Sequence, residues 1–489
     1  MVNPFIRVGM AGMLALLIGS GMYQPAFAAV KAPDSLVYQQ QEARIDEVLH
    51  QLVEHHLNSN LDIKKLTDAA IQGMVNQTGD PYTSYFNDDQ FKTFIDNVEG
   101  DFAGLGIFVD EKNGRFFVHS VLDKSPADLA GVRAGDEILK IDGDSVTGMK
   151  IEQVTGKIQG AAGSYVFMDL KRAGKVLSFE IQRQELQIPP VESRMLNNHI
   201  GYLQLSTFST DAPDAMRTNL DKLKQQGMKS LIFDMRDNPG GHVDAAIQIA
   251  GMFLPKGKHV VVYVEDRTGQ KQALDTDGSN WDYPLIVLVN KGTASASEIV
   301  TSALQSYGVA RVIGTTTYGK GVMQDIQPLK TGGVLKMTVE EYFSPTMKKI
   351  NEVGITPDFT VDSPDQQLLQ AVAQLNGALT LGLNNDGTIQ LAGFPVADNN
   401  LLARRIGGKW YIGLRSFADT YGWNIYWDGK LQQITLTEGK MQKKYPARSS
   451  AMKNVNGFFF IPVDILVQDF SSISTEKQPD GLLLRVSQG

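Results

Sequence analysis

The stretch that most constrains this chain runs from Tyr283 to Gln324. It opens with an unbroken apolar run, 284–289, of the length and composition typical of a parallel strand that is covered on both faces. A helical pattern begins at Ser295 and ends at Gly308, and a second short strand follows at 309–313. This order predicts a strand–loop–helix–strand unit of an α/β sheet, whose chemistry lies outside the carboxyl ends of the strands.

Ser295 stands where the predicted helix begins, so unpaired backbone N–H groups lie next to its hydroxyl. A serine nucleophile needs such donors and a base for its proton. Ser295 and Glu298 also fit the S-x-x-E capping pattern, and helix capping is the alternative interpretation. Lys320, between Gly319 and Gly321, is a candidate base because burial lowers the pKa of a lysine toward neutrality.

The runs TASASEI (293–299) and TYGKG (317–321) resemble the carboxyl-terminal processing, or tail-specific, protease family. The resemblance implies that Ser295 is the nucleophile, Lys320 the general base and Gln324 the residue that orients the lysine. Thr293 departs from the family pattern, which commonly has serine there. The segments 80–86 (DPYTSYF) and 353–359 (VGITPDF) resemble the family as well, so the likeness covers about 38–375.

A double glycine follows a second strand-like run, 229–235, within DMRDNPGG (234–241). Two glycines between a strand and a helix allow backbone N–H groups to face a developing negative charge. The family resemblance implies an oxyanion hole here, built from the N–H groups of Gly241 and Ala296, with Gly240 as neighbour. His242 is an alternative base, because a Ser-His pair is the commoner chemistry.

The region 99–184 has short strands and glycine turns, and DFAGLGIFVD (101–110) with SPADLAGVRAGDEILKIDG (125–143) resembles a bacterial PDZ domain. Such domains add an extended peptide to a sheet edge and hold its terminal carboxylate on backbone N–H groups. The resemblance implies a carboxylate loop at Leu105, Gly106 and Ile107, and a groove flanked by the helix around Val154.

The N-terminal segment predicts export. Arg7, an apolar run at 8–22 and Ala26-Phe27-Ala28 form the pattern of a signal peptide over residues 1–28. The expected location is extracytoplasmic, secreted or associated with the cell envelope, and an uncleaved membrane anchor is the alternative. Helical periodicity occupies 38–76 with a break at 58–61, and the family resemblance implies that this region makes a homodimer.

Composition limits the chemistry further. The chain has no cysteine, which excludes thiol catalysis and disulfides, and its net charge of -8 argues against a nucleic-acid partner. His55 and His56 lack the H-E-x-x-H pattern, and no histidine occurs after His259. The sequence therefore predicts neither a metal site nor a cofactor.

The last part of the chain has a different character. Residues 409–437 read as strand, helix, hairpin and strand, and 457–466 repeats part of the pattern. This resembles the small repeat module named after the N-terminal part of copper amine oxidases, which suggests a cell-surface association. Trp410, Trp423 and Trp427 are expected in its core.

Together these features predict a multidomain protein of α/β and α+β class. The expected domains are a signal peptide (1–28), a helical region (29–98), a PDZ domain (99–184), a Ser-Lys protease core (185–375) and the repeat-like module (376–489). The expected function is an exported serine endopeptidase that binds exposed protein C-termini. Two alternatives stay open, a non-catalytic PDZ protein that binds peptides and an acyl hydrolase that uses the same serine.

Overall fold

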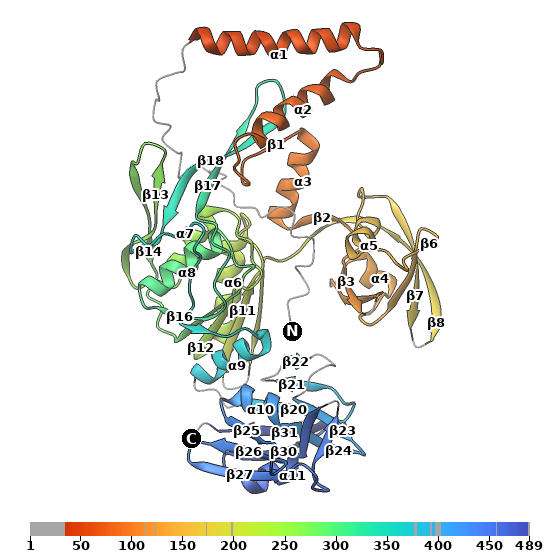
Figure 1. Ribbon diagram of the computed structural model, residues 1–489, viewed down its shortest axis with the longest axis vertical. Coiled ribbons are helices and arrows are strands. Elements are labelled where there is room, and N and C mark those ends of the chain that lie inside the picture. Colours follow the sequence, from red (N-terminus) through yellow and green to blue (C-terminus); the bar gives the residue numbers. More distant parts are fainter. Residues whose placement is uncertain are drawn as a thin grey trace.

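The computed structural model describes residues 35–112, 114–122, 124–172, 174–196, 199–375, 379–391, 394–396, 402–455 and 457–487. It confirms the multidomain α/β and α+β class, with an N-terminal helical part, a small β-rich domain, an α/β core and a C-terminal α+β module (Figure 1). The expected signal peptide, 1–28, lies outside the described residues. Among the described residues, no helix combines the length and apolar character that crossing a membrane requires.

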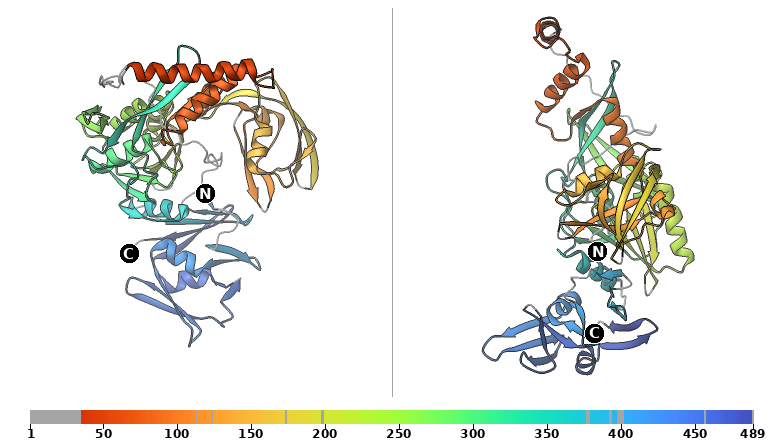
Figure 2. Two further views of the ribbon diagram at one scale, coloured as in Figure 1. Left: turned by 45° about the horizontal axis from the view of Figure 1, so that its top comes forward. Right: turned by 90° about the vertical axis from the view of Figure 1, so that its right-hand side faces the viewer.

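The N-terminal part consists of helices and one short strand: α1 (Ser35–His55), α2 (Ile63–Asn76), β1 (Ser84–Phe86) and α3 (Asp88–Glu99). The expected break between two helices is confirmed, since Asp62 caps α2 by accepting a hydrogen bond from the N–H of Lys65. Figure 2 shows α1 as a straight helix at one end of the molecule. Most of its large apolar side chains are exposed to solvent.

The small β-rich domain carries a six-stranded sheet and two short helices. Its elements are β3 (Ile107–Lys112), β4 (Arg115–Val121), α4 (Pro126–Ala130), β5 (Glu137–Ile141), β6 (Asp144–Ser145), α5 (Ile151–Ile158), β7 (Tyr165–Arg172) and β8 (Lys175–Gln182). The chain enters and leaves this domain through β2 (Asp101–Gly104) and β9 (Gln184–Gln187), which pair with each other. Figure 1 shows the domain standing beside the core on this two-stranded connection.

The core is built on a six-stranded sheet of order β10-β11-β12-β15-β16-β19, parallel except for β10. The strands are β10 (Val191–Met195), β11 (Ile200–Leu205), β12 (Ser230–Asp234), β15 (Leu285–Val289), β16 (Ala310–Gly314) and β19 (Phe359–Thr360). The helices are α6 (Ala212–Gln225), α7 (Val243–Gly251), α8 (Ala296–Ser306) and α9 (Pro364–Gln374).

Side chains alternate between the two faces along each strand, and an apolar cluster covers each face, so both faces are buried. Phe233 and Val287 pack into the apolar cluster that contains residues of α6, α7 and α8. Ile232 and Ile286 belong to a second cluster, which includes residues of α9 and of the C-terminal module. The continuous apolar run at 284–289 is explained by this two-sided burial.

A second sheet joins the N-terminal part to the core. Its order is β1-β18-β13-β14, with β17 also paired to β18. Its other strands are β13 (Gly257–Asp266), β14 (Lys271–Gly278), β17 (Val322–Pro328) and β18 (Val334–Phe343). Strand β1 pairs with β18 from Ser84 opposite Lys336 to Phe86 opposite Val334. The N-terminal segment is thereby fixed beside the strand that follows Lys320.

The C-terminal module has three small sheets and two helices. Its elements are β20 (Leu379–Asn384), β21 (Ile389–Leu391), β22 (Phe394–Val396), β23 (Ala403–Ile406), β24 (Lys409–Gly413), α10 (Leu414–Tyr421), β25 (Asn424–Asp428), β26 (Gln433–Glu438), β27 (Met441–Pro446), β28 (Lys453–Val455), β29 (Phe458–Pro462), α11 (Val463–Asp469), β30 (Ile473–Gln478) and β31 (Gly481–Val486). A hairpin, a helix and a second hairpin occur twice in this order, which accounts for the echo in the sequence.

One expectation for this module is wrong. Trp410 and Trp423 pack against its apolar cluster, but Trp427 is 38% exposed. The Trp427 ring lies on β25 and stacks on Phe459, with ring centroids 5.5 Å apart. Alternation along a short strand of an outer hairpin places this side chain at the surface.

Candidate active site

Ser295 occupies the loop between the carboxyl end of β15 and the first residue of α8, and its side chain is buried. Its backbone has φ 58° and ψ -117°, a conformation that costs a non-glycine residue of order 1–3 kcal/mol. Gly240 packs directly against it, since a Cβ at Gly240 would lie 2.9 Å from the Cβ of Ser295. Such strain at the start of a helix is typical of a site that presents one side chain in a fixed direction.

Glu298 connects the serine loop to the lysine loop. Its Oε2 accepts hydrogen bonds from the N–H of Ser295 at 2.8 Å and from the N–H of Lys320 at 2.9 Å. Its Oε1 accepts from Thr317 Oγ1 at 2.5 Å and from the N–H of Gly319 at 2.7 Å. Burial raises the pKa of Glu298, and these four hydrogen bonds oppose the rise because they favour the carboxylate.

The capping interpretation of Ser295 is therefore half right. Glu298 accepts from the serine N–H as a capping residue does, but capping is only part of its role. The other carboxylate oxygen, Oε1, accepts hydrogen bonds from Thr317 and Gly319, which lie about twenty residues further along the chain.

Lys320 is fully buried, and its Nζ has no hydrogen-bond partner among the described residues. Burial, followed by the charge of Lys336, holds the pKa of Lys320 well below its usual value. The amine lies 4.8 Å from the centroid of the Tyr82 ring, which belongs to the N-terminal part of the chain. Lys320 thus has the environment of a neutral amine, as a general base requires.

Gln324 is buried on β17, four residues after the lysine in the sequence. Its Nε2 donates to Thr338 Oγ1 at 3.3 Å and to the carbonyl of Val322 at 3.4 Å. Its Oε1 has no partner within the described part of the chain, and the register of β17 with β18 shifts between Met323 and Gln324. Bulges of this kind re-aim side chains beside functional sites.

The hydroxyl of Tyr342, on β18, stands between the two loops. It donates a hydrogen bond to the backbone carbonyl of Lys320, and it interacts with the Ser295 side chain. The serine hydroxyl is therefore in contact with Tyr342 here, while the amine of Lys320 makes no hydrogen bond. Glu298 brings the two loops together, but the direct hydrogen bond between Ser295 and Lys320 is not formed.

The double-glycine turn lies beside the serine, at Gly240. A Cβ at Gly240 would come within 3.0 Å of Ala296 N, so the double-glycine turn packs on the start of α8. In the described residues no hydrogen bond leaves the N–H of Gly241 or of Ala296. The neighbouring N–H of Gly240 is occupied, because it donates to Asn238 Oδ1 at 2.9 Å. Within the described residues the N–H groups of Gly241 and Ala296 are thus available as donors, as an oxyanion hole requires.

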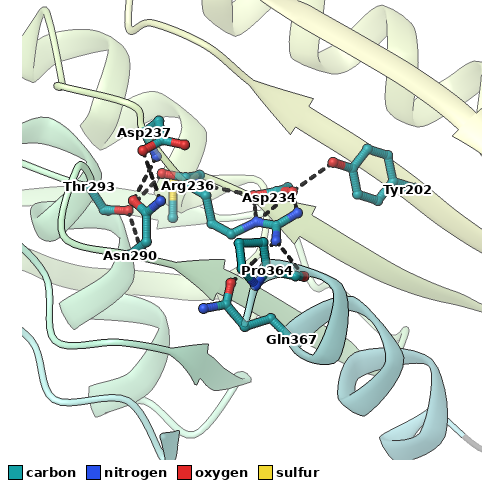
Figure 3. Close-up of polar contacts among 9 residues, drawn as sticks. Tyr202, Asp234, Arg236, Asp237, Asn290, Thr293, Pro364 and Gln367 are labelled. Carbon is teal, nitrogen blue, oxygen red and sulfur yellow. Dashed lines mark hydrogen bonds and ion pairs between the residues drawn. The ribbon is translucent and has the colours of Figure 1, made fainter. Parts of the chain in front are cut away.

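A buried ion pair braces the turn that leads to these glycines (Figure 3). Arg236 donates through Nε and Nη2 to the carboxylate of Asp234, which also accepts from the Tyr202 hydroxyl at 2.6 Å. The Arg236 Nη1 reaches the carbonyl of Pro364 at 2.9 Å and Gln367 Oε1 at 3.3 Å. The Arg236 guanidinium thus connects the turn to helix α9, which covers the sheet face opposite to α6, α7 and α8.

A second polar group in Figure 3 joins this turn to the serine loop. The N–H of Asp237 donates to Asn290 Oδ1, and Asn290 Nδ2 donates to Asp237 Oδ1, both at 2.8 Å. Thr293 Oγ1 donates to the carbonyl of Met235 at 2.8 Å. Threonine at 293, where the resembled family has serine, therefore still supplies the hydroxyl that ties the two loops together.

Three family models match parts of this chain. Residues 199–361, which include the serine, the lysine and the double glycine, match the model of peptidase family S41. Residues 199–361 form a peptidase family S41 domain. Residues 117–172 match a PDZ domain, and 25–90 match the N-terminal domain of the activating protease CtpB.

Curated proteins that this chain resembles are named as proteases. The chain is 35% identical over 306 residues to the carboxy-terminal processing protease CtpA of Bacillus subtilis, covering 62% of this chain and 66% of that protein. It is 34% identical over 313 residues to a probable CtpA-like serine protease of Staphylococcus aureus, covering 64% and 63%. The chain thus spans somewhat less than two thirds of the length of these relatives.

Among solved structures, the photosystem II D1 C-terminal processing protease is 28% identical to this chain. The similarity covers 67% of this chain and 89% of that one, with a TM-score of 0.42.

His242, the alternative base, follows the double glycine of the S41 domain and is buried. Its Nε2 lies 2.7 Å from Glu99 Oε1, and Glu99 Oε2 accepts from both the N–H and the hydroxyl of Thr210. Glu99 is the last residue of α3, and only Gly100 separates it from the strand that enters the PDZ domain. The imidazole thus faces the connection to the PDZ domain, and no hydrogen bond between His242 and Ser295 occurs among the described residues.

The expected peptide-binding residues occupy different surroundings in the PDZ domain. The N–H groups of Leu105 and Gly106 make no hydrogen bond among the described residues, whereas their carbonyls accept from Ala127 and Leu122. Ile107 begins β3 and is partly buried. The expectation for Val154 needs correction, because its side chain is fully buried in the domain core and does not line an open groove.

Several important residues of the S41 domain site were missed. Tyr342 and Lys336 lie on β18, and nothing local in their sequence marks them. Tyr82 lies within the resembled segment 80–86, which is a signal that could have drawn attention to it. In the described part of the chain, no group of three or more acidic or histidine side chains is arranged to hold a metal ion.

Proposed function

We propose that this protein is a serine endopeptidase that processes proteins from their C-terminal ends, with Ser295 as nucleophile and Lys320 as general base. The observation that carries the proposal is the buried, unpartnered amine of Lys320 on a loop that Glu298 fastens to the serine loop. A lysine kept neutral by burial beside a serine at a helix start suits acyl transfer. The named relatives support the same activity.

In the proposed reaction, Lys320 Nζ takes the proton of the Ser295 hydroxyl while the Oγ attacks the carbonyl carbon of the peptide. The resulting oxyanion accepts hydrogen bonds from the N–H groups of Gly241 and Ala296. The carbon–nitrogen bond then breaks, and Lys320 gives its proton to the leaving amine. Water hydrolyses the acyl-enzyme with the same lysine as base.

Peptide binding has a further role in this proposal. The serine hydroxyl contacts Tyr342, and both the amine of Lys320 and Gln324 Oε1 are buried without partners. Unsatisfied buried groups of this kind cost free energy, which their pairing would recover. A substrate that draws the serine hydroxyl away from Tyr342 would let Gln324 and Ser295 engage the two sides of the amine.

The decisive experiment compares wild-type protein with Ser295→Ala and Lys320→Ala on an unstructured protein substrate. We expect both variants to lose cleavage, while Ser450→Ala and Lys348→Ala, which alter exposed residues, retain it. Undiminished cleavage by either site variant contradicts the assignment. Ester substrates assayed in parallel test the acyl-hydrolase alternative, and peptide binding without turnover by the wild-type protein would favour the non-catalytic one.

Recognition by the PDZ domain is part of the proposal. Free N–H groups at Leu105 and Gly106 suit a terminal carboxylate. Cleavage of a substrate with a free C-terminus should exceed cleavage of the same chain with an amidated C-terminus. Equal rates would show that the PDZ domain does not select substrates by their terminal carboxylate.

We further propose that the protein is exported and forms a homodimer through its N-terminal helices. Export rests on the signal-peptide pattern in residues 1–28. The dimer is supported by apolar side chains of α1 that are exposed in one chain, namely Leu36, Val37, Tyr38, Ile45, Val48 and Leu52. Cell fractionation tests the location, and light scattering before and after removal of 35–62 tests the dimer. Association with the cell surface through 376–489 is a proposal that the same fractionation tests.

A further inference from the structure

The ring of Tyr82 covers the amine of the proposed catalytic lysine. Its centroid lies 4.8 Å from Lys320 Nζ, although the two residues are far apart in the sequence. The contact arises because β1 pairs with β18, which also pairs with β17 directly after the lysine loop. The turn that precedes β1 is therefore carried over the amine.

This turn is held firmly in place. Asp80 Oδ1 accepts from the N–H of Tyr82 at 3.0 Å, and its Oδ2 accepts from Thr83 Oγ1 at 2.5 Å. Thr83 Oγ1 in turn accepts from the N–H of Thr338 on β18 at 3.1 Å. Tyr85 anchors the strand, since its hydroxyl donates to Asp68 Oδ1 at 2.7 Å. The position of the Tyr82 ring is thus defined by both neighbouring elements.

We propose that Tyr82 is a positioning residue for the reaction, whose ring keeps water from the Lys320 amine and stabilises the ammonium ion that forms when the lysine accepts the serine proton. The inference rests on the proposed function. An aromatic face attracts a cation more strongly when both are withdrawn from water. Because the ammonium exists only after proton transfer, this attraction acts on the transition state and not on the resting enzyme.

The charged and titratable groups around the amine act in both directions. Burial lowers the pKa of Lys320 most, Lys336 on β18 lowers it further, and Asp80 and Glu298 raise it. Lys336 is itself buried against the rings of Phe86 and Phe94, and burial lowers its pKa to about 8. The other groups are the phenols of Tyr82, Tyr318 and Tyr342. Burial, and then Tyr318, raise the pKa of Tyr82 to about 12, so its ring is neutral during catalysis.

The test is the pH dependence of kcat/KM for Tyr82→Phe, Tyr82→Leu and Tyr82→Ala, since the midpoint of the rising limb reports the free enzyme's base. Phenylalanine keeps the ring, so its midpoint should equal that of the wild type. Leucine keeps apolar cover but removes the aromatic face, so its midpoint should fall by about half a unit to one unit. Alanine admits water, which solvates the ammonium, so its midpoint should rise.

A role in packing alone would lower the rate without moving the midpoint. Equal midpoints in all variants, or a shift in the same direction for leucine and alanine, would overturn the inference. Should the leucine variant fail to fold, pentafluorophenylalanine at position 82 has the shape of phenylalanine but repels a cation, and its midpoint should lie below that of Tyr82→Phe. A midpoint equal to that of Tyr82→Phe overturns the proposal equally.

A matched control and a separate readout keep this test distinct from that of the proposed function. Tyr426→Leu changes an exposed tyrosine of the C-terminal module and should leave the profile unchanged. If Ser295→Ala or Lys320→Ala still cleaves, the proposed function fails. If both are inactive and the Tyr82 variants keep the wild-type midpoint, the inference about Tyr82 alone fails.

Discussion

Ser295 and Lys320 donate their backbone N–H groups to the same carboxylate oxygen, Oε2 of Glu298, at 2.8 and 2.9 Å. Their two nitrogens therefore lie no further apart than the sum of these distances. The clamp acts on the main chain of both loops and leaves both side chains free to react. The proposed dyad thus depends on a third residue that touches neither the serine hydroxyl nor the lysine amine through a hydrogen bond.

Replacing Glu298 by glutamine should disrupt this clamp. An amide offers one acceptor oxygen, so its NH₂ group would face backbone N–H donors that the second carboxylate oxygen now satisfies. A displacement of about 1 Å between reacting groups costs about 100-fold in rate, and we expect a loss of this size in kcat. The measurement is steady-state cleavage of an unstructured substrate. Glu352→Gln, an exposed change on a nearby loop, serves as control and should behave as wild type. Full activity of Glu298→Gln would show that the carboxylate is dispensable.

Local patterns predicted the elements of the core because each depends on neighbours in sequence. The apolar run at 284–289 and the helix start at Ser295 lie where expected, as β15 and α8. Glu298 was also noticed, but only as a capping residue. Its second oxygen binds groups of 317–319, and no local pattern reports such a contact.

The residues that sequence reasoning missed are those that tertiary pairing brings to the site. Tyr82 reaches Lys320 only because β1 joins the sheet of β17 and β18. Tyr342 and Lys336 both lie on β18. The Tyr342 hydroxyl donates to the carbonyl of Lys320, and the charge of Lys336 lowers the pKa of the Lys320 amine. The PDZ domain shows the opposite error. The resemblance to a PDZ domain placed the helix around Val154 beside the groove, but the Val154 side chain itself packs into the domain core.

The neutral state of Lys320 should come at the expense of stability. The pKa of Lys320 in the folded protein lies below its ordinary value of 10.5. At pH values between the folded pKa and 10.5, the unfolded chain therefore binds more protons than the folded one. Stability consequently rises with pH over this range. Lys320→Met removes the unpartnered amine and should raise Tm by about 2–4 °C at pH 7. The gain should shrink as pH approaches 10.5. Thermal unfolding across this range checks it, with the exposed Lys348→Met as reference. A gain that grows with pH would contradict the buried neutral amine.

The ion pair of Arg236 and Asp234 should support both stability and activity. Arg236→Lys keeps the charge, but one ammonium cannot reproduce the two-pronged contact with Asp234 together with the bonds to Pro364 and Gln367. We expect about 1–3 kcal/mol less free energy of unfolding. Urea unfolding measures it, and cleavage should fall as the turn before the oxyanion glycines loosens. Arg217→Lys, which alters an exposed pair with Asp214, should change neither quantity.

Gly240 should be intolerant of a side chain for a reason that is specific to the serine. It has φ 105°, and a Cβ there would lie 2.9 Å from the Cβ of Ser295 and 3.0 Å from Ala296 N. Gly240→Ala should therefore displace the serine or the start of α8, with a loss of about 100-fold in kcat. Gly439→Ala separates this clash from backbone strain, because Gly439 also has positive φ but open space around its Cβ position. Both variants should lose some stability, measured by thermal unfolding, and only Gly240→Ala should lose cleavage. If the two variants retain equal activity, the double-glycine turn does not set the position of Ser295.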